Sequence, residues 1–176
     1  MKTYSVALLA VALMAGSTAA GATGVAARSQ ATTLGTVTIP VIAGGYRITL
    51  MIGPREAMYT QAEARRTHPK TGEIMLRGSM MMGGMGMGMA MPNRHLEVHV
   101  LDRRTMRPAS NPMVSITYQA LSPMMMRPVS VPVAVMVGLS MDMSDIHYGN
   151  NVSMAGGTYR VSVHVNRAYA TYAVRL

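Results

Sequence analysis

The feature that most constrains the fold of this chain is a series of short segments in which apolar and polar residues alternate. Successive side chains of a strand point to opposite faces, so this alternation predicts strands with one buried face. Such segments recur from residue 36 onwards. They are 36–42, 46–52, 73–77, 95–102, 113–119, 130–137, 159–166 and 168–176.

Turn residues separate most of these segments. We predict turns at Gly44-Gly45, Arg107-Pro108, Ser122-Pro123, Gly149-Asn150 and Gly156-Gly157. Glycine and proline favour turn conformations, and their close spacing is typical of antiparallel strands rather than of βαβ units. The predicted fold class is therefore all-β, an antiparallel β-sandwich.

Two segments interrupt the predicted strands. The stretch from Glu56 to Arg66 follows Pro54 and contains good helix formers, which predicts a short helix that ends at His68-Pro69. The segment 78–92 alternates methionine with glycine and has no pattern that would build a packed element, so it is predicted to be a loop.

The N-terminus has the pattern of a secretory signal peptide. Lys2 precedes an apolar run of 10 residues from Val6 to Ala15, and small residues between Ala20 and Ala27 offer cleavage sites. A membrane-spanning helix needs about 20 apolar residues, so this run does not predict one. We expect a signal peptide at 1–27, a flexible leader at 28–35 and one domain at 36–176, exported to a periplasmic or extracellular location and not membrane-spanning.

The composition of the chain limits which cross-links, metal sites and partners it can have. The 176 residues include no cysteine, which excludes disulfides and thiolate metal sites. The formal charge is +9, but the basic residues are scattered, so we do not expect nucleic-acid binding. Methionine is unusually frequent, with 21 residues.

Many of the methionines are clustered. A thioether is a soft ligand that selects Cu(I), and intervening glycines let several sulfurs reach one ion. We predict a secondary Cu(I) site in the 78–92 loop. An apolar surface for a protein partner and a plain linker are the alternatives. The loop methionines are Met80, Met81, Met82, Met85, Met87, Met89 and Met91, and further groups lie at 124–126 and at Met141 and Met143.

Histidines and one glutamate share a strand face. In the segment 95–100, alternation places His95, Glu97 and His99 on the face opposite the core. The same argument places His164 on the polar face of the 159–166 strand. If the two strands lie near each other, these groups converge on a site suited to Cu, Zn, Ni or Fe. Ordinary solvation of a sheet face is the alternative explanation.

The segment DIHYGNNV at 145–152 resembles the periplasmic Fe²⁺-transport protein family. A Gly-Thr-Tyr at 157–159, the strand carrying His164 and the His-x-Glu-x-His strand at 95–99 extend the resemblance over about residues 95–176. The resemblance implies an immunoglobulin-like sandwich that binds copper, of a family often encoded beside a ferrous-iron permease. A homodimer is plausible through this resemblance alone.

The resemblance also implies a ligand set. The matching positions are His95, Met141, His147 and His164, with Glu97 and His99 as adjacent groups.

Together, these features predict an exported metal-binding protein that captures copper, with iron as a second candidate, for buffering or delivery to a membrane iron or copper permease. Catalysis is not required, and no nucleophile motif or acid/base pair is present. Two rival functions stay open: an exported interaction module with a methionine-rich surface and no metal role, and a copper or iron oxidase.

Overall fold

The computed structural model describes residues 25–28, 36–79, 91–139 and 141–176. Outside these ranges lie residues 1–24 of the signal peptide predicted at 1–27, residues 29–35 of the leader predicted at 28–35, and residues 80–90 of the methionine loop. The strands are β1 (Val25–Arg28), β2 (Val37–Ala43), β3 (Tyr46–Pro54), β4 (Met58–Thr60), β5 (Glu73–Arg77), β6 (Arg94–Asp102), β7 (Val114–Ser122), β8 (Val129–Val131), β9 (Ala134–Gly138), β10 (His147–Val152), β11 (Thr158–Val165) and β12 (Ala168–Arg175). The helices are α1 (Gln61–Thr67) and the 3₁₀ turn η1 (Met143–Asp145).

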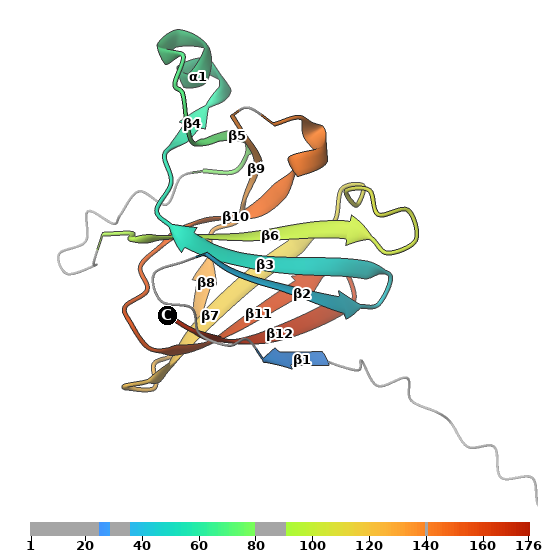
Figure 1. The fold of residues 1–176 in the computed structure, drawn as a ribbon, viewed down its shortest axis with the longest axis vertical. Helices are drawn as coiled ribbons and strands as arrows, with labels where there is room; N and C mark the ends of the chain where they lie inside the picture. The colour runs from blue at the N-terminus through green and yellow to red at the C-terminus, as the bar shows by residue number, and fades with distance from the viewer. Residues whose placement is uncertain (1–24, 29–35, 80–90, 140) are drawn as a thin grey trace, which may run out of the picture.

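These strands form two sheets, and the all-β sandwich is confirmed (Figure 1). One sheet has the order β1-β12-β11-β7-β8, and the other has the order β2-β3-β6-β10-β9-β5-β4. Neighbouring strands are antiparallel, except for the parallel pairs β1–β12 and β4–β5. Among the described residues, no helix combines the length and the apolar composition that crossing a bilayer requires.

The main core lies between the inner faces of the two sheets. Strands β2 and β11 alternate buried and more exposed residues along their length, as the sequence pattern predicts. Tyr172 of β12 is fully buried, and its hydroxyl donates a hydrogen bond of 3.0 Å to the carbonyl of Ile48 on β3. This bond joins the two sheets through the core and satisfies a polar group that would otherwise be costly to bury.

The predicted helix is shorter than expected at its N-terminal end. Residues 58–60 pair with β5 as strand β4, and α1 begins only at Gln61. Thr60 and Glu63 form a capping box, which fixes the first turn at this position. The helix ends at His68, which takes a left-handed conformation with φ 47°.

The predicted strand at 130–137 is two strands that belong to different sheets. Strand β8 ends at Val131 in the five-stranded sheet, and β9 begins at Ala134 in the seven-stranded sheet. Pro132 lies between them and has no N–H to donate to a ladder, which explains why the strand is interrupted there.

The predicted turn at Gly149-Asn150 is also wrong, because both residues lie inside β10. A Cβ atom at Gly149 would lie 1.9 Å from the carbonyl oxygen of Leu96, so only glycine allows β10 to pair this closely with β6. The Asn150 side chain donates to the carbonyls of Ser79 and Pro132, at 3.0 and 2.7 Å. The motif therefore secures a central strand of the seven-stranded sheet.

Candidate metal centre

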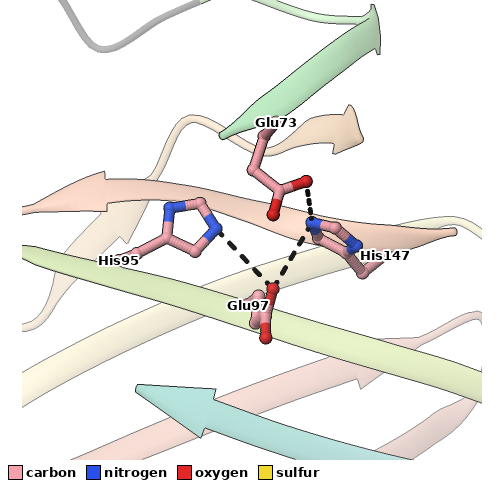
Figure 2. A group of neighbouring side chains, drawn as sticks. All are labelled: Glu73, His95, Glu97 and His147. Atoms are coloured by element: carbon pink, nitrogen blue, oxygen red, sulfur yellow. Dashed lines mark ion pairs between the residues drawn. The ribbon is translucent and has the colours of Figure 1, made fainter. Parts of the chain in front are cut away.

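The outer face of the seven-stranded sheet carries a cluster of histidines and carboxylates. On β6, Leu96, Val98 and Val100 point into the core, so His95, Glu97 and His99 share the opposite face, as predicted. His147 of β10 is the register partner of His99 and therefore lies on the same face. Figure 2 shows His95, Glu97 and His147 pointing toward one another.

Glu73 completes the cluster from strand β5. The side chains of Glu73 and His147 meet because β9 pairs with β10 on one side and with β5 on the other. In Figure 2 the Glu73 carboxylate reaches toward His147 from the side of the cluster opposite Glu97. One ligand atom from each of Glu73, His95, Glu97 and His147 lies within 4.8 Å of the others.

The solvated face that ordinary sheet polarity predicts is not observed here. His95 and His147 are 2% and 1% exposed, and Glu73 is 7% exposed. A row of apolar residues on the same face, Met58, Met75, Ala134 and Met136, forms a second small core beside the cluster. Met136 is the register partner of His147, so a buried thioether borders the site.

Both buried rings are oriented by hydrogen bonds on the far nitrogen. His95 Nδ1 lies 3.1 Å from Asn151 Oδ1, and His147 Nδ1 lies 2.8 Å from the carbonyl oxygen of Asp145. A carbonyl oxygen only accepts, so each Nδ1 must donate. Each Nε2 then faces the cluster and offers it a lone pair whenever that nitrogen carries no proton, which is the arrangement of histidines that ligate metals. The same Asn151 is held by Glu56, whose N–H donates to it at 3.1 Å.

The distances between the inward atoms fit a shared cation. His147 Nε2 lies 3.2 Å from Glu73 Oε2 and 3.4 Å from Glu97 Oε2, and His95 Nε2 lies 3.7 Å from Glu97 Oε2. With bonds of about 2.0 to 2.2 Å, tetrahedral ligand atoms around one ion lie about 3.3 to 3.6 Å apart. The preorganised spacing therefore approximates a coordination shell.

Three of these atoms have no hydrogen-bond partner among the described residues. They are Glu73 Oε2, His95 Nε2 and His147 Nε2, all buried. These atoms face one another across the cluster, where a protonated His147 pairs with the carboxylates of Glu73 and Glu97. The donor set of two imidazoles and two carboxylates suits divalent first-row metals better than Cu(I), which prefers soft sulfur ligands.

The pKa values of His95, Glu97 and His147 are set by burial and by the neighbouring charges of the cluster. Burial lowers the pKa of His147, but its contact with Glu73 and the charge of Glu97 outweigh burial and raise that pKa to about 9. His95 differs, because its burial outweighs the carboxylates and lowers its pKa. Burial would raise the pKa of Glu97, yet its contact with His99 and the charge of His147 hold that pKa below its usual value. The protonated imidazolium of His147 is thus favoured near neutral pH, beside the carboxylates of Glu73 and Glu97.

A more accessible side of the cluster is formed by three groups. His99, Asp145 and His147 also offer ligand atoms within 4.8 Å of one another, and the side chains of His99 and Asp145 are 21% and 23% exposed. His99 Nε2 lies 3.6 Å from the second oxygen of Glu97. An ion entering from solvent would meet these groups before it reached the buried set.

His164 does not join the cluster. It lies on β11 in the five-stranded sheet, where its ring stacks against Tyr169 with centroids 4.5 Å apart. The apolar partners of the β11 alternation fill the core, so His164 faces solvent on the opposite outer surface. The sequence correctly predicts the face of each strand, but the condition for convergence is not met, because β6 and β11 belong to different sheets.

The methionines predicted as ligands lie outside the buried set. Met141 and Met143 are each 59% exposed in the segment before β10, and Met141 lies beside Gly138 at the end of β9. In the loop, Met80, Met81, Met82, Met85, Met87 and Met89 fall outside the described residues, and Met91 is 69% exposed.

Sequence reasoning missed Glu73 and Asp145 as members of the site. Glu73 appeared only as the first residue of a short strand. One available signal was charge: the chain has 7 acidic residues, and Glu56, Glu73, Glu97 and Asp145 all surround these histidines. No known protein family, curated protein or solved structure matches this chain.

Proposed function

We propose that this protein binds a divalent transition metal in the Glu73, His95, Glu97 and His147 cluster and holds it for buffering or transfer. Copper as Cu(II) and iron as Fe(II) are the candidate ions, because both accept imidazole together with carboxylate ligands. The observation that carries the proposal is the convergence of one ligand atom from each of these four side chains within 4.8 Å, with Glu73, His95 and His147 buried.

Charge balance supports a divalent ion. Two ionised glutamates and two neutral histidines carry a charge of −2, which a divalent cation neutralises in a buried site. An unpaired buried charge is costly, and a bound ion removes that cost. The partly exposed groups His99 and Asp145 support a site that exchanges its ion, because they provide additional ligands along the way out.

Delivery to a membrane permease after export is part of the proposal and rests on the signal-peptide pattern and the family resemblance. The methionine loop remains a proposed secondary site for Cu(I). Replacing its methionines with leucine is expected to lower the Cu(I) stoichiometry and to leave Cu(II) binding at the histidines unchanged.

Calorimetric titration of the metal-stripped protein with Cu(II), and separately with Fe(II) under anaerobic conditions, tests the main site. His95→Ala and His147→Ala are each expected to weaken binding by at least about 100-fold, since each removes a direct ligand. His164→Ala is the matched control, because it removes a histidine from the opposite sheet and should leave binding unchanged. Binding that is indifferent to His95 and His147, or that depends on His164, would contradict the assignment.

A further inference from the structure

A second feature, independent of the metal cluster, lies at one end of the sandwich. Three connections meet there: the β2–β3 turn at 44–45, the β6–β7 loop at 103–113 and the β11–β12 turn at 166–167. Figure 1 shows the β2–β3 turn and the β6–β7 loop together at the right-hand end, away from the C-terminus. We call these three segments the loop end.

Hydrogen bonds hold the loop end together. Asn166 exchanges backbone and side-chain bonds with Met113, at 2.9 and 3.0 Å, and its amide donates to the Tyr46 hydroxyl at 2.7 Å. The N–H of Arg103 donates to the carbonyl of Gly45 at 2.9 Å. The loops are therefore preorganised relative to one another, which lowers the entropic cost of docking on a partner surface.

The loop end is strongly basic. Arg103, Arg104, Arg107 and Arg167 are exposed within these three segments, which contain no acidic residue. Asp102, at the end of β6, accepts bonds from the N–H groups of Arg104 and Thr105, and its charge offsets one of the four arginines. The four exposed arginines still outnumber this one carboxylate, so the loop end presents a net positive charge to any surface that approaches it.

Exposed apolar side chains stand among the arginines. Met113, Met106 and, at the adjacent end of β2, Ile42 are 75%, 47% and 43% exposed. Met106 also has φ 55°, a left-handed conformation that residues other than glycine and asparagine rarely adopt. These three side chains therefore offer apolar contacts beside the arginines.

We propose that the loop end docks on an anionic phospholipid surface. Arginines provide attraction to the headgroups, and isolated apolar side chains that protrude from turns enter the boundary between headgroups and acyl chains. An acidic protein partner would use the same charges, but separate protruding methionines fit a deformable bilayer better than a rigid protein surface. The proposal does not depend on metal binding at the cluster.

Sedimentation with large vesicles tests the proposal, using the full chain and two compositions: phosphatidylcholine alone, and phosphatidylcholine with one quarter phosphatidylglycerol. Each arginine near an anionic surface contributes about fivefold in affinity, so Arg103→Gln, Arg104→Gln and Arg107→Gln together should weaken binding to anionic vesicles on the order of 100-fold. A control with Arg65→Gln, Arg66→Gln and Arg127→Gln loses the same charge away from the loop end and should retain most of the binding. Every variant carries the same apolar segment at 6–15, so its contribution cancels.

Methionine oxidation gives a second readout of the same contact. In peroxide each exposed thioether takes one oxygen atom and releases water, and mass spectrometry locates the sulfoxide. Anionic vesicles should slow oxidation of Met106 and Met113 and leave Met124 and Met125, which are 74% and 73% exposed on another loop, unaffected. Equal loss of binding in both arginine triples, equal binding to both vesicle types, or retention on an acidic polypeptide but not on vesicles would overturn the proposal.

Discussion

Replacing Glu73 with glutamine should expose how the cluster is held in the absence of metal. The substitution keeps the shape of the side chain and removes one of the two carboxylates that face His147 Nε2. Those carboxylate oxygens lie at similar distances from His147 Nε2, 3.2 Å for Glu73 and 3.4 Å for Glu97. At an effective dielectric constant of about 20, a unit charge pair at such a distance attracts by about 5 kcal/mol.

The expected shift follows from the pKa of His147. Its rise from 6.5 to about 9 is the net result after burial has opposed it, and it corresponds to about 3 kcal/mol in favour of the imidazolium. Two carboxylates provide most of the opposing attraction. Loss of the Glu73 charge therefore removes at least about half of the net rise in the His147 pKa. Glu73→Gln should lower that pKa by more than about one pH unit.

The sign of the stability change follows from the same pKa. Because the folded protein binds the His147 proton more tightly than the unfolded chain, this stabilisation is fully present below pH 6.5 and is lost as the pH rises through about 9. The unfolding free energy of the metal-free wild type should fall by about 3 kcal/mol over that window, and that of Glu73→Gln by clearly less. His95 has a lowered pKa and acts in the opposite sense only below pH 6.5.

Nuclear magnetic resonance of the imidazole nitrogens measures the His147 pKa directly, and urea unfolding at several pH values measures the stability. Glu63→Gln is the matched control, because it also removes one negative charge, and glutamine still completes the capping box of α1. An unchanged His147 pKa in Glu73→Gln, or an equal shift in Glu63→Gln, would refute the reasoning.

Three further predictions concern the surroundings of the cluster. Gly149→Ala should destabilise the fold by about 3 kcal/mol, because the new Cβ would lie 1.9 Å from the Leu96 carbonyl oxygen. Thermal unfolding should show a lower midpoint, and an unchanged midpoint would count against the close pairing of β10 with β6. Asn151→Ala should weaken metal binding by about 10- to 100-fold in calorimetry, because it frees the His95 ring to rotate; full affinity would remove Asn151 from the site. Because the proton on His147 competes with the metal, the affinity for Cu(II) should rise about tenfold per pH unit up to about pH 9. An affinity that does not change with pH would show that His147 does not bind the ion.

Local sequence pattern predicts the faces of the strands but not their neighbours. Alternation correctly groups His95, Glu97 and His99, because a period of two is fixed by the backbone itself. The same rule places His164 on an outer face, yet it cannot say which sheet that face belongs to. Strand pairing depends on contacts far apart in the sequence, so the separation of His164 from the cluster could not be read from period alone.

The sequence pattern does not reveal that the cluster is buried, for a related reason. A strand with polar residues on one face normally presents that face to water. Here the β9 and β5 pairings extend the sheet, and Glu73 reaches the cluster 22 residues before His95 in the chain. A short strand of ordinary composition gives no local sign that its first residue will lie against a histidine on another strand.

The motif at 147–151 shows how one strand can serve two faces of the sheet. Tyr148 packs into the main core, and Asn150 binds the carbonyls of Ser79 and Pro132. These two residues secure the strand from the side opposite the cluster. The residues that alternate with them, His147, Gly149 and Asn151, then lie on the outer face of the sheet.

Those alternate residues all serve the candidate site. His147 supplies an inward nitrogen, Gly149 lets β10 approach β6 closely, and Asn151 holds the His95 ring in place. Neither Gly149 nor Asn151 would ligate an ion, and neither would be chosen for strand propensity, since glycine and asparagine are both depleted in strands. Two poor strand formers in the centre of a sheet are best explained by the geometry they impose on the histidines, which is why their substitution should affect metal affinity as well as stability.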